Sequence, residues 1–190
     1  MLSAITQKIT SLIVAAGSLF LSSVTGTNAV FEDVEIIRYD NKIVCSATLS
    51  NCFNEELDKI FLSGEIIRIN FVIQTFEKGN REPIDEKTFH HYIKYDLVDQ
   101  YFEIYLSETD NNFISEDITE SKTKLAKIEE FEVIKTDLLE LGRKYYIKLT
   151  AEMESIYLDA LHKNIDLMIY WNNKNATLKT KLFEKSILKL

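Results

Sequence analysis

The sequence is poor in glycine, proline, cysteine and tryptophan. Its 190 residues include five Gly, one Pro, two Cys and one Trp. So little Gly and Pro excludes a collagen-like or proline-rich chain, and two Cys cannot build a disulfide-dense scaffold. The sequence also lacks a glycine-rich phosphate loop, a dinucleotide-binding fingerprint, a His-Glu-x-x-His pattern and a nucleophile elbow. The common sequence signatures of enzymes are therefore absent.

The rest of the composition is typical of a folded, acidic domain. Hydrophobic residues make up 46% and charged residues 27%, which excludes a disordered chain. The net charge is −8, so binding to DNA or RNA gains nothing from counterion release and we expect no nucleic-acid partner. The segment from Asp99 to Asp137 contains eleven acidic residues and four lysines, whereas the segment from Lys174 to Leu190 contains five lysines and one acidic residue. Solvated surfaces explain this asymmetry, and a docking surface for an oppositely charged partner is the alternative.

An uncharged apolar stretch near the start of the chain predicts export. It runs from Ile9 to Val24, follows Lys8, and is shorter than the roughly 20 apolar residues of a bilayer span. The small residues of Thr27-Asn28-Ala29 suit a cleavage site after Ala29, and Val24-Thr25-Gly26 is a second candidate. We predict a signal peptide over 1–29 and one domain over 30–190, in the periplasm or another extracytoplasmic compartment. An uncleaved anchor in the inner membrane is the alternative.

The two cysteines, Cys45 and Cys52, are a candidate disulfide pair. An oxidising compartment would permit the bond. The extended chain between them is longer than disulfide geometry allows, so a bridge needs an intervening turn. The alternative is two unpaired thiols, with Cys45 on the apolar face of a strand. Their spacing fits neither a metal site nor a Cys-x-x-Cys redox motif.

Strict alternation of apolar and polar residues predicts antiparallel β-sheets. Each predicted strand has one polar and one apolar face, which indicates two sheets packed over a shared core. The first two strands should form a hairpin around Asp40-Asn41, a pair that tolerates turn geometry. The predicted strands are Glu35–Tyr39, Ile43–Leu49, Ile67–Thr75, Phe89–Leu97, Phe102–Leu106, Tyr145–Met153, Ile165–Trp171 and Leu178–Phe183.

Two short helices are expected between these strands. Asn54 is suited to the N-cap of the first, and Gly64 to the left-handed residue beyond its end. The second should run from about Glu116 to Ile128, and Ser155–Lys163 is a candidate helical crossover. We therefore predict a mainly β, β-rich α+β fold: an antiparallel β-sandwich with two short helices, preceded by an N-terminal hydrophobic signal helix.

Residues with catalytic or metal-binding chemistry do not form a convincing constellation. His90 and His91 are adjacent in a predicted strand, so they point to opposite faces and cannot readily share a metal. The carboxylates Glu55-Glu56 and Glu129-Glu130-Glu132 could supply acid–base pairs, but a helix N-terminus and a solvated face explain them better. We predict no catalytic residues, no metal and no cofactor.

Three tyrosines are candidate ligand-binding residues. Tyr92, Tyr146 and Tyr170 lie on predicted polar faces, where a phenol ring can stack on a sugar or an apolar ligand. The alternative is that they cover sheet edges or the rim of the core.

Three stretches of sequence occur in an order and spacing typical of a known family. They are Leu49–Leu57, Tyr92–Tyr101 and Leu141–Tyr146. Together they resemble the exported bacterial "domain of unknown function 4390" family over most of Val34 to Phe183. The resemblance implies a small periplasmic or envelope protein without assigned catalytic residues. Such proteins are sometimes encoded near sensor kinases, which implies an accessory signalling role. The resemblance also implies structural roles for Leu57, Phe71, Gly64, Tyr95, Tyr101 and Gly142.

The leading functional hypothesis is an exported, non-catalytic protein that binds another envelope or membrane protein as an accessory signalling module. The second hypothesis is a binder of a small apolar or carbohydrate ligand, held between the sheets or on the tyrosine-bearing face. The third is a carboxylate-dependent hydrolase, which would need two acids converging in one cleft.

Overall fold

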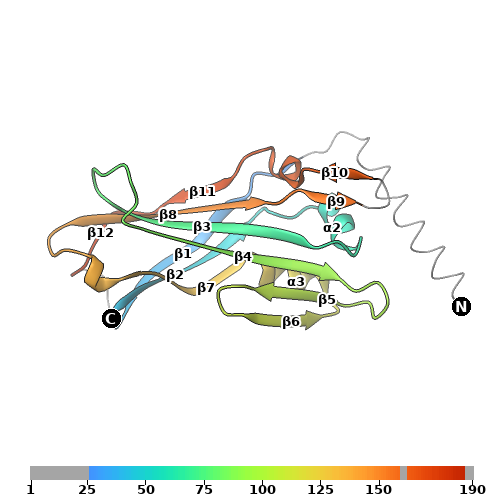
Figure 1. Cartoon of the computed structure of the whole chain (residues 1–190), viewed down its shortest axis with the longest axis horizontal. Helices are drawn as coiled ribbons and strands as arrows, with labels where there is room; N and C mark the ends of the chain where they lie inside the picture. Colours follow the sequence, from blue (N-terminus) through green and yellow to red (C-terminus); the bar gives the residue numbers. More distant parts are fainter. Residues whose placement is uncertain (1–25, 159–161, 187–190) are drawn as a thin grey trace, which may run out of the picture.

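The computed structural model describes residues 26–158 and 162–186, which form two packed antiparallel sheets (Figure 1). The larger sheet has seven strands in the order β11-β8-β3-β4-β5-β6, with β12 also pairing with β8. Its strands are β3 (Ile67–Glu77), β4 (Asp85–Tyr95), β5 (Phe102–Leu106), β6 (Asn111–Ser115), β8 (Lys144–Met153), β11 (Ala176–Lys179) and β12 (Phe183–Glu184).

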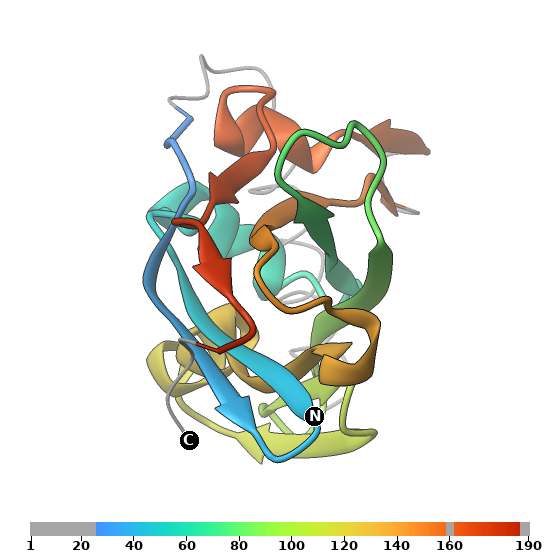
Figure 2. The same cartoon turned by 90° about the vertical axis from the view of Figure 1, so that its left-hand side faces the viewer.

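The smaller sheet has the order β1-β2-β7, and a separate two-stranded ribbon pairs β9 with β10. The strands are β1 (Val30–Tyr39), β2 (Lys42–Ser50), β7 (Lys127–Lys135), β9 (Ile156–Leu158) and β10 (Lys163–Ile165). Seen from the end of the molecule, the small sheet lies across one face of the large one (Figure 2). The predicted mainly β, antiparallel architecture is confirmed, and the predicted N-terminal helix lies outside the described residues.

The core lies between the inner faces of the two sheets. Along β3 the even-numbered positions from Arg68 to Gln74 are partly exposed, while Ile67, Ile69, Phe71 and Ile73 are buried, as the alternation predicts. Central β3 is flanked on both sides: Phe71 pairs with Phe89 of β4 and with Ala151 of β8. Apolar residues of both sheets belong to a single buried cluster.

Two α-helices cap the core, α2 (Glu55–Phe61) and α3 (Ile118–Ala126). The Asn54 side chain accepts a hydrogen bond from the Leu57 N–H at 2.9 Å, which confirms the predicted N-cap. Gly64 has φ +86°, and a Cβ there would lie 3.0 Å from Leu97 Cδ1, so both conformation and space favour glycine. No helix within the described part of the chain has the length and apolarity needed to cross a membrane.

The turns are formed largely by acids and amides, as the scarcity of Gly and Pro predicts. Asp40, Asp110, Asn172 and Asn173 all have φ between 54° and 55°, a conformation that Asn and Asp adopt at lower cost than other non-glycine residues. The residues assigned to family motifs also lie as expected: Leu57 and Phe71 are buried, and Gly142 has φ +74° in the turn before β8.

The region after α3 differs from the prediction. The helix ends at Ala126 instead of continuing to Ile128, and β7 begins at Lys127. A bulge hides this strand in the sequence: Glu130 has φ +46°, and the pairing of β2 with β7 shifts register between Cys45 and Ala47. The extra residue breaks the alternation by which a strand is recognised.

The C-terminal third also differs. The predicted helical crossover at Ser155–Lys163 is wrong where the structure describes it, because Ile156–Leu158 and Lys163–Ile165 form the β9–β10 ribbon. The predicted strand Ile165–Trp171 is wrong too. Its main part is the 3₁₀-helix η3 (Leu167–Trp171), in which the Asp166 side chain accepts from the Met168 N–H at 2.9 Å. Leu178–Phe183 is divided between β11 and β12.

Candidate functional site

A buried histidine–glutamate pair is the most chemically suggestive arrangement in the core. His91 lies on the inner face of β4, fully buried, and its Nε2 is 2.9 Å from Oε1 of Glu108, which follows β5. Its Nδ1 is 2.8 Å from the carbonyl oxygen of Leu125 in α3. Because a carbonyl only accepts, Nδ1 carries a proton. A hydrogen bond between Nε2 and the carboxyl group needs one further proton, carried by one of these two groups.

The surroundings of this pair favour a structural role. In a catalytic triad, one ring nitrogen of the histidine contacts the acid and the other contacts the nucleophile. In His91 the nitrogen that does not contact Glu108 is Nδ1, and it is hydrogen-bonded to the Leu125 carbonyl. The rings of Phe71 and Phe89 lie 4.8 and 5.6 Å from the imidazole and seal it from solvent. The pair therefore joins β4, the β5–β6 connection and α3 without offering an accessible base.

The neighbouring His90 lies on the opposite face, as predicted. It is half-buried near Tyr105, at 5.9 Å between ring centroids, and burial together with Arg68 lowers its pKa. Among the residues described, no group of three or more His, Cys, Asp and Glu side chains is arranged to hold a metal ion.

Of the carboxylates singled out in the sequence, Glu129 and Glu132 form ion pairs with lysines, and Glu55 and Glu56 lie at the start of a helix. Glu132 Oε1 is 3.1 Å from Nζ of Lys87, and that lysine lowers the pKa of Glu132. Lys127 likewise lowers the pKa of Glu129. Glu55 and Glu56 stand in the first turn of α2, where they complement the helix dipole. A general acid needs a raised pKa, and the lysines act in the opposite direction.

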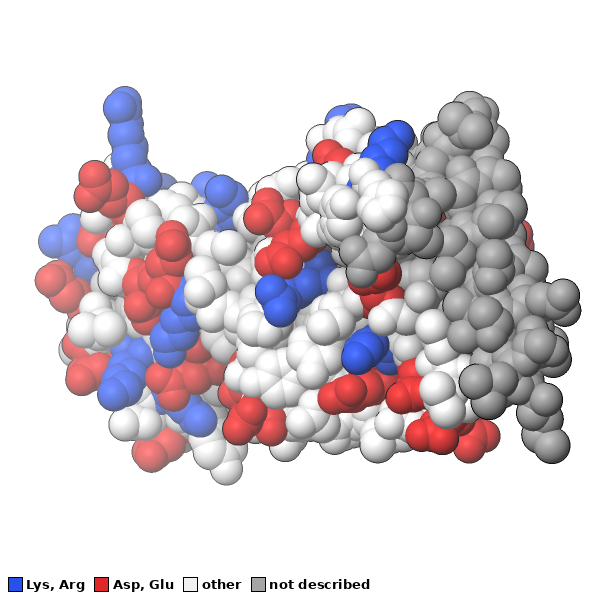
Figure 3. Space-filling view, turned by 45° about the vertical axis from the view of Figure 1, so that its right-hand side comes forward, with Lys and Arg blue, Asp and Glu red and all other residues white. Residues whose placement is uncertain are grey.

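Acidic and basic side chains both lie on the face seen in Figure 3. Part of the acidic excess between Asp99 and Asp137 is offset by Lys87, which lies outside this segment and pairs with Glu132. The two signs are mixed on the left of this view, and acidic side chains predominate along its lower right edge (Figure 3).

The three candidate tyrosines are not brought together. Tyr92 pairs in register with Arg68, and Tyr146 with Phe76, so the two lie at opposite ends of β3. Tyr146 stacks on Phe76 at 5.1 Å, and Lys179 Nζ lies 3.7 Å from its ring centroid. Tyr170 is buried in η3, so its predicted place on a polar strand face is wrong. The segment forms a helix, and the alternation on which that prediction rested does not apply to it.

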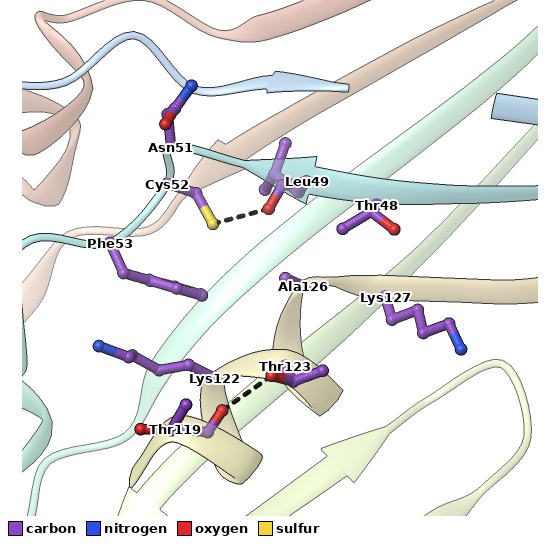
Figure 4. A pocket seen from close by; sticks show the side chains of 10 residues that line it. All are labelled: Thr48, Leu49, Asn51, Cys52, Phe53, Thr119, Lys122, Thr123, Ala126 and Lys127. Atoms are coloured by element: carbon purple, nitrogen blue, oxygen red, sulfur yellow. Dashed lines mark hydrogen bonds between the residues drawn. The ribbon is translucent and has the colours of Figure 1, made fainter. Parts of the chain in front are cut away.

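A groove lies between the end of β2 and α3 (Figure 4), with a volume of about 510 Å³. Its size suits a small ligand. Much of its polar lining is engaged within the chain: Lys122 Nζ is 2.9 Å from Asp58 Oδ2, and Thr123 Oγ1 donates to the Thr119 carbonyl at 2.8 Å. Sequence reasoning missed this groove because its walls come from distant segments: Thr48, Leu49, Asn51, Cys52, Phe53, Thr119, Lys122, Thr123, Ala126 and Lys127.

The two cysteines are free, buried thiols. Cys45 points into the core from β2, whereas Cys52 follows that strand and donates through Sγ to the Leu49 carbonyl at 3.0 Å. Burial raises the pKa of each thiol to about 12. Both groups are therefore held in the unreactive protonated form.

We expect the native protein to react very slowly with a thiol reagent such as Ellman's reagent. The thiolate is the reactive species, so burial should slow modification at pH 8 at least about a hundredfold relative to the unfolded chain. The measurement compares absorbance traces of native and urea-unfolded protein, without reductant. Two thiols should appear on unfolding. Rapid native reaction would contradict the burial, and no reaction after unfolding would reveal a disulfide.

One end of the sandwich presents exposed apolar side chains at two connections, the β1–β2 turn and the segment between β7 and β8. We call it the distal tip, defined by Tyr39, Leu138 and Leu141, which are 66%, 57% and 76% exposed. Figure 2 looks onto this end of the molecule. Soluble domains rarely gather large apolar side chains at one exposed place unless a partner covers them.

Hydrogen bonds hold the distal tip together. The Asn41 carbonyl accepts from the backbone N–H and the hydroxyl of Thr136, at 2.7 and 3.0 Å. Lys185 accepts from Arg38 through its carbonyl at 3.4 Å and donates through Nζ to the Leu139 carbonyl at 2.9 Å. The β1–β2 turn, the connection before β8 and the segment after β12 therefore form one surface.

The fold defines a class of protein: an antiparallel β-sandwich with two short α-helices. A family model described as "Domain of unknown function (DUF4390)" matches residues 26–160. The chain belongs to this family, which confirms the resemblance found in the sequence. No curated protein and no solved structure matches the chain.

Proposed function

We propose that this chain is an exported, non-catalytic envelope protein that binds another protein through the distal tip, as an accessory module. The observation that carries the proposal is the exposure of Tyr39, Leu138 and Leu141 on connections held together by hydrogen bonds. Fixed connections lose little conformational entropy on binding, and aromatic and aliphatic side chains supply most of the energy at protein interfaces.

The position of the tip supports this role. β1 runs from Val30 to Tyr39, so the tip lies at the opposite end of this strand from the place where the chain emerges from its apolar N-terminal segment. A partner can therefore approach the tip from the end of the domain opposite the N-terminal segment, whether or not that segment is removed. Non-catalytic function is supported by the closed His91–Glu108 pair and by the lysine-paired carboxylates of β7.

A small-ligand binder is the second candidate, and the groove beside α3 is the observation that favours it. The space between the sheets is occupied by core side chains, so a ligand would sit in this groove and not inside the sandwich. A molecule of defined mass that stays bound in native mass spectrometry of the purified protein would support this alternative.

We expect a charge at the tip to weaken partner binding. Leu141→Glu and Tyr39→Glu each place a carboxylate where an apolar contact is proposed, and should weaken capture of the partner by about thirtyfold, the effect of a hot-spot residue. The measurement is crosslinking in the envelope followed by affinity purification, with the recovered proteins quantified against wild type.

The matched control is Ile114→Glu. Ile114 lies on β6 and is 70% exposed, close to the 76% of Leu141, but it belongs to the edge of the large sheet. The proposal requires that this variant retain wild-type capture. Equal loss in all three variants, or no specific partner with wild type, would overturn it.

A further inference from the structure

The residues just after the apolar N-terminal segment are built into the domain. The Thr27 N–H donates to the Tyr170 carbonyl at 2.9 Å, and its hydroxyl donates to the Asn51 carbonyl at 2.6 Å. Nδ2 of Asn172 donates to the Thr27 carbonyl and to Oδ1 of Asn28, both at 3.1 Å. Ala29 is buried in the core cluster. These three residues therefore tie the start of β1 to η3 and to the end of β2.

Gly26 lies at the border of this packed segment. A Cβ at position 26 would stand 2.4 Å from Asn172 Oδ1 and 2.7 Å from the Ile169 carbonyl oxygen. Contacts this short cannot be accommodated without shifting backbone, so only glycine fits. Gly26 itself contributes no side chain to the core. Thr27, Asn28 and Ala29 also lie within the range that the family model matches.

The two candidate cleavage sites differ in what they would remove. A cut after Ala29 would delete the buried methyl group and all four hydrogen bonds of Thr27 and Asn28 named above. It would also place a charged ammonium on Val30, next to the core position that Ala29 occupied. A cut after Gly26 would remove none of these contacts, and the new ammonium of Thr27 could still donate to the Tyr170 carbonyl.

We propose that the export signal is removed after Gly26, so that the mature protein begins at Thr27 and keeps Thr27-Asn28-Ala29 as structural residues. Hydrolysis of the Gly26–Thr27 peptide bond by a signal peptidase consumes one water, and leaves a carboxylate on Gly26 and an ammonium on Thr27. This inference rests on the export that the proposed function includes, and is independent of the distal tip.

The test is the N-terminus of the full-length gene product in an exporting bacterial host. Intact-mass measurement and N-terminal sequencing of the periplasmic and membrane fractions should find a chain that starts at Thr27. A chain that starts at Val30, or an exported chain that retains residues 1–26, would overturn the inference and leave the tip proposal standing. A full-length chain confined to the cytoplasm would overturn the export proposal as well.

Matched variants locate the cut without depending on folding, because the readout is mass under denaturing conditions. Gly26→Tyr and Ala29→Tyr place the same large side chain just before each candidate bond, where processing requires a small residue. Val24→Tyr places a large side chain two residues before Gly26, at the other position of this site where processing favours a small residue. We expect Gly26→Tyr and Val24→Tyr to lose the product that starts at Thr27, and Ala29→Tyr to retain it. The opposite pattern would refute a cut after Gly26.

Discussion

Replacing Glu108 with Ala should destabilise the domain by about 3–5 kcal/mol, the usual cost of removing one partner of a buried ion pair. The substitution leaves Nε2 of His91 without its partner at a site that solvent does not reach. An imidazole that must stay buried with one unsatisfied nitrogen raises the free energy of the folded state, while the unfolded state is barely affected. Urea unfolding followed by circular dichroism measures the change.

Two further variants separate loss of the pair from loss of a charge. Glu108→Gln keeps the shape and can donate an amide N–H to Nε2 of a neutral imidazole, so it should cost much less than Glu108→Ala. The double variant His91→Leu/Glu108→Leu replaces the pair with apolar side chains and should recover most of the stability. A buried ion pair rarely stabilises the folded state more than well-packed apolar side chains of similar volume. A loss below about 1 kcal/mol in Glu108→Ala would show that the pair does not hold the core.

Trp171→Ala should cost a similar amount, about 3–5 kcal/mol, because it opens a large cavity. The indole is fully buried in η3, and its Nε1 donates to the Cys52 carbonyl at 2.8 Å. That bond links the C-terminal part of the chain to the segment after β2. Trp171→Phe fills most of the cavity but leaves the carbonyl unpaired, which should cost about 1–3 kcal/mol.

Val98→Ala is the control for the tryptophan variants. Val98 is 80% exposed in the β4–β5 connection, so its truncation should change stability by no more than about 0.5 kcal/mol. Because Trp171 is the single tryptophan, unfolding of all these variants is best followed by circular dichroism. Equal stability of Trp171→Ala and Val98→Ala would contradict the packing of η3 described above.

Strands that obey simple alternation could be predicted from the sequence. β3, β4 and β8 bury every second residue against one core, so the pattern alone indicates their faces. β7 could not be predicted, because the bulge at Glu130 shifts the alternation by one residue. The strand-like pattern of η3 misled the prediction, since Asp166 and Asn172 form caps that end the strand conformation on either side.

The His91–Glu108 pair and the distal tip depend on tertiary contacts, which could not be predicted from the sequence. The sequence placed His91 on an apolar face but gave no sign of Glu108, which reaches it because β4 pairs with β5 and His91 lies opposite Leu106. A search for acids just beyond the residues that pair with a buried histidine would have found it. The distal tip was missed because Tyr39 lies at the end of β1 and Leu138 and Leu141 lie between β7 and β8, and only the fold brings these segments together.

The pairing of β3 with β8 also bears on how fast the domain can form. Ile69 pairs with Met153, and the whole β3–β8 ladder joins the first half of the chain to its second half. Such distant pairing must close a long loop before it gains any stability, and β-rich domains of this kind fold in milliseconds to seconds. The central sheet cannot be completed until β8 has been synthesised. Under the proposed export, this delay would keep the new chain unfolded while it is carried across a membrane.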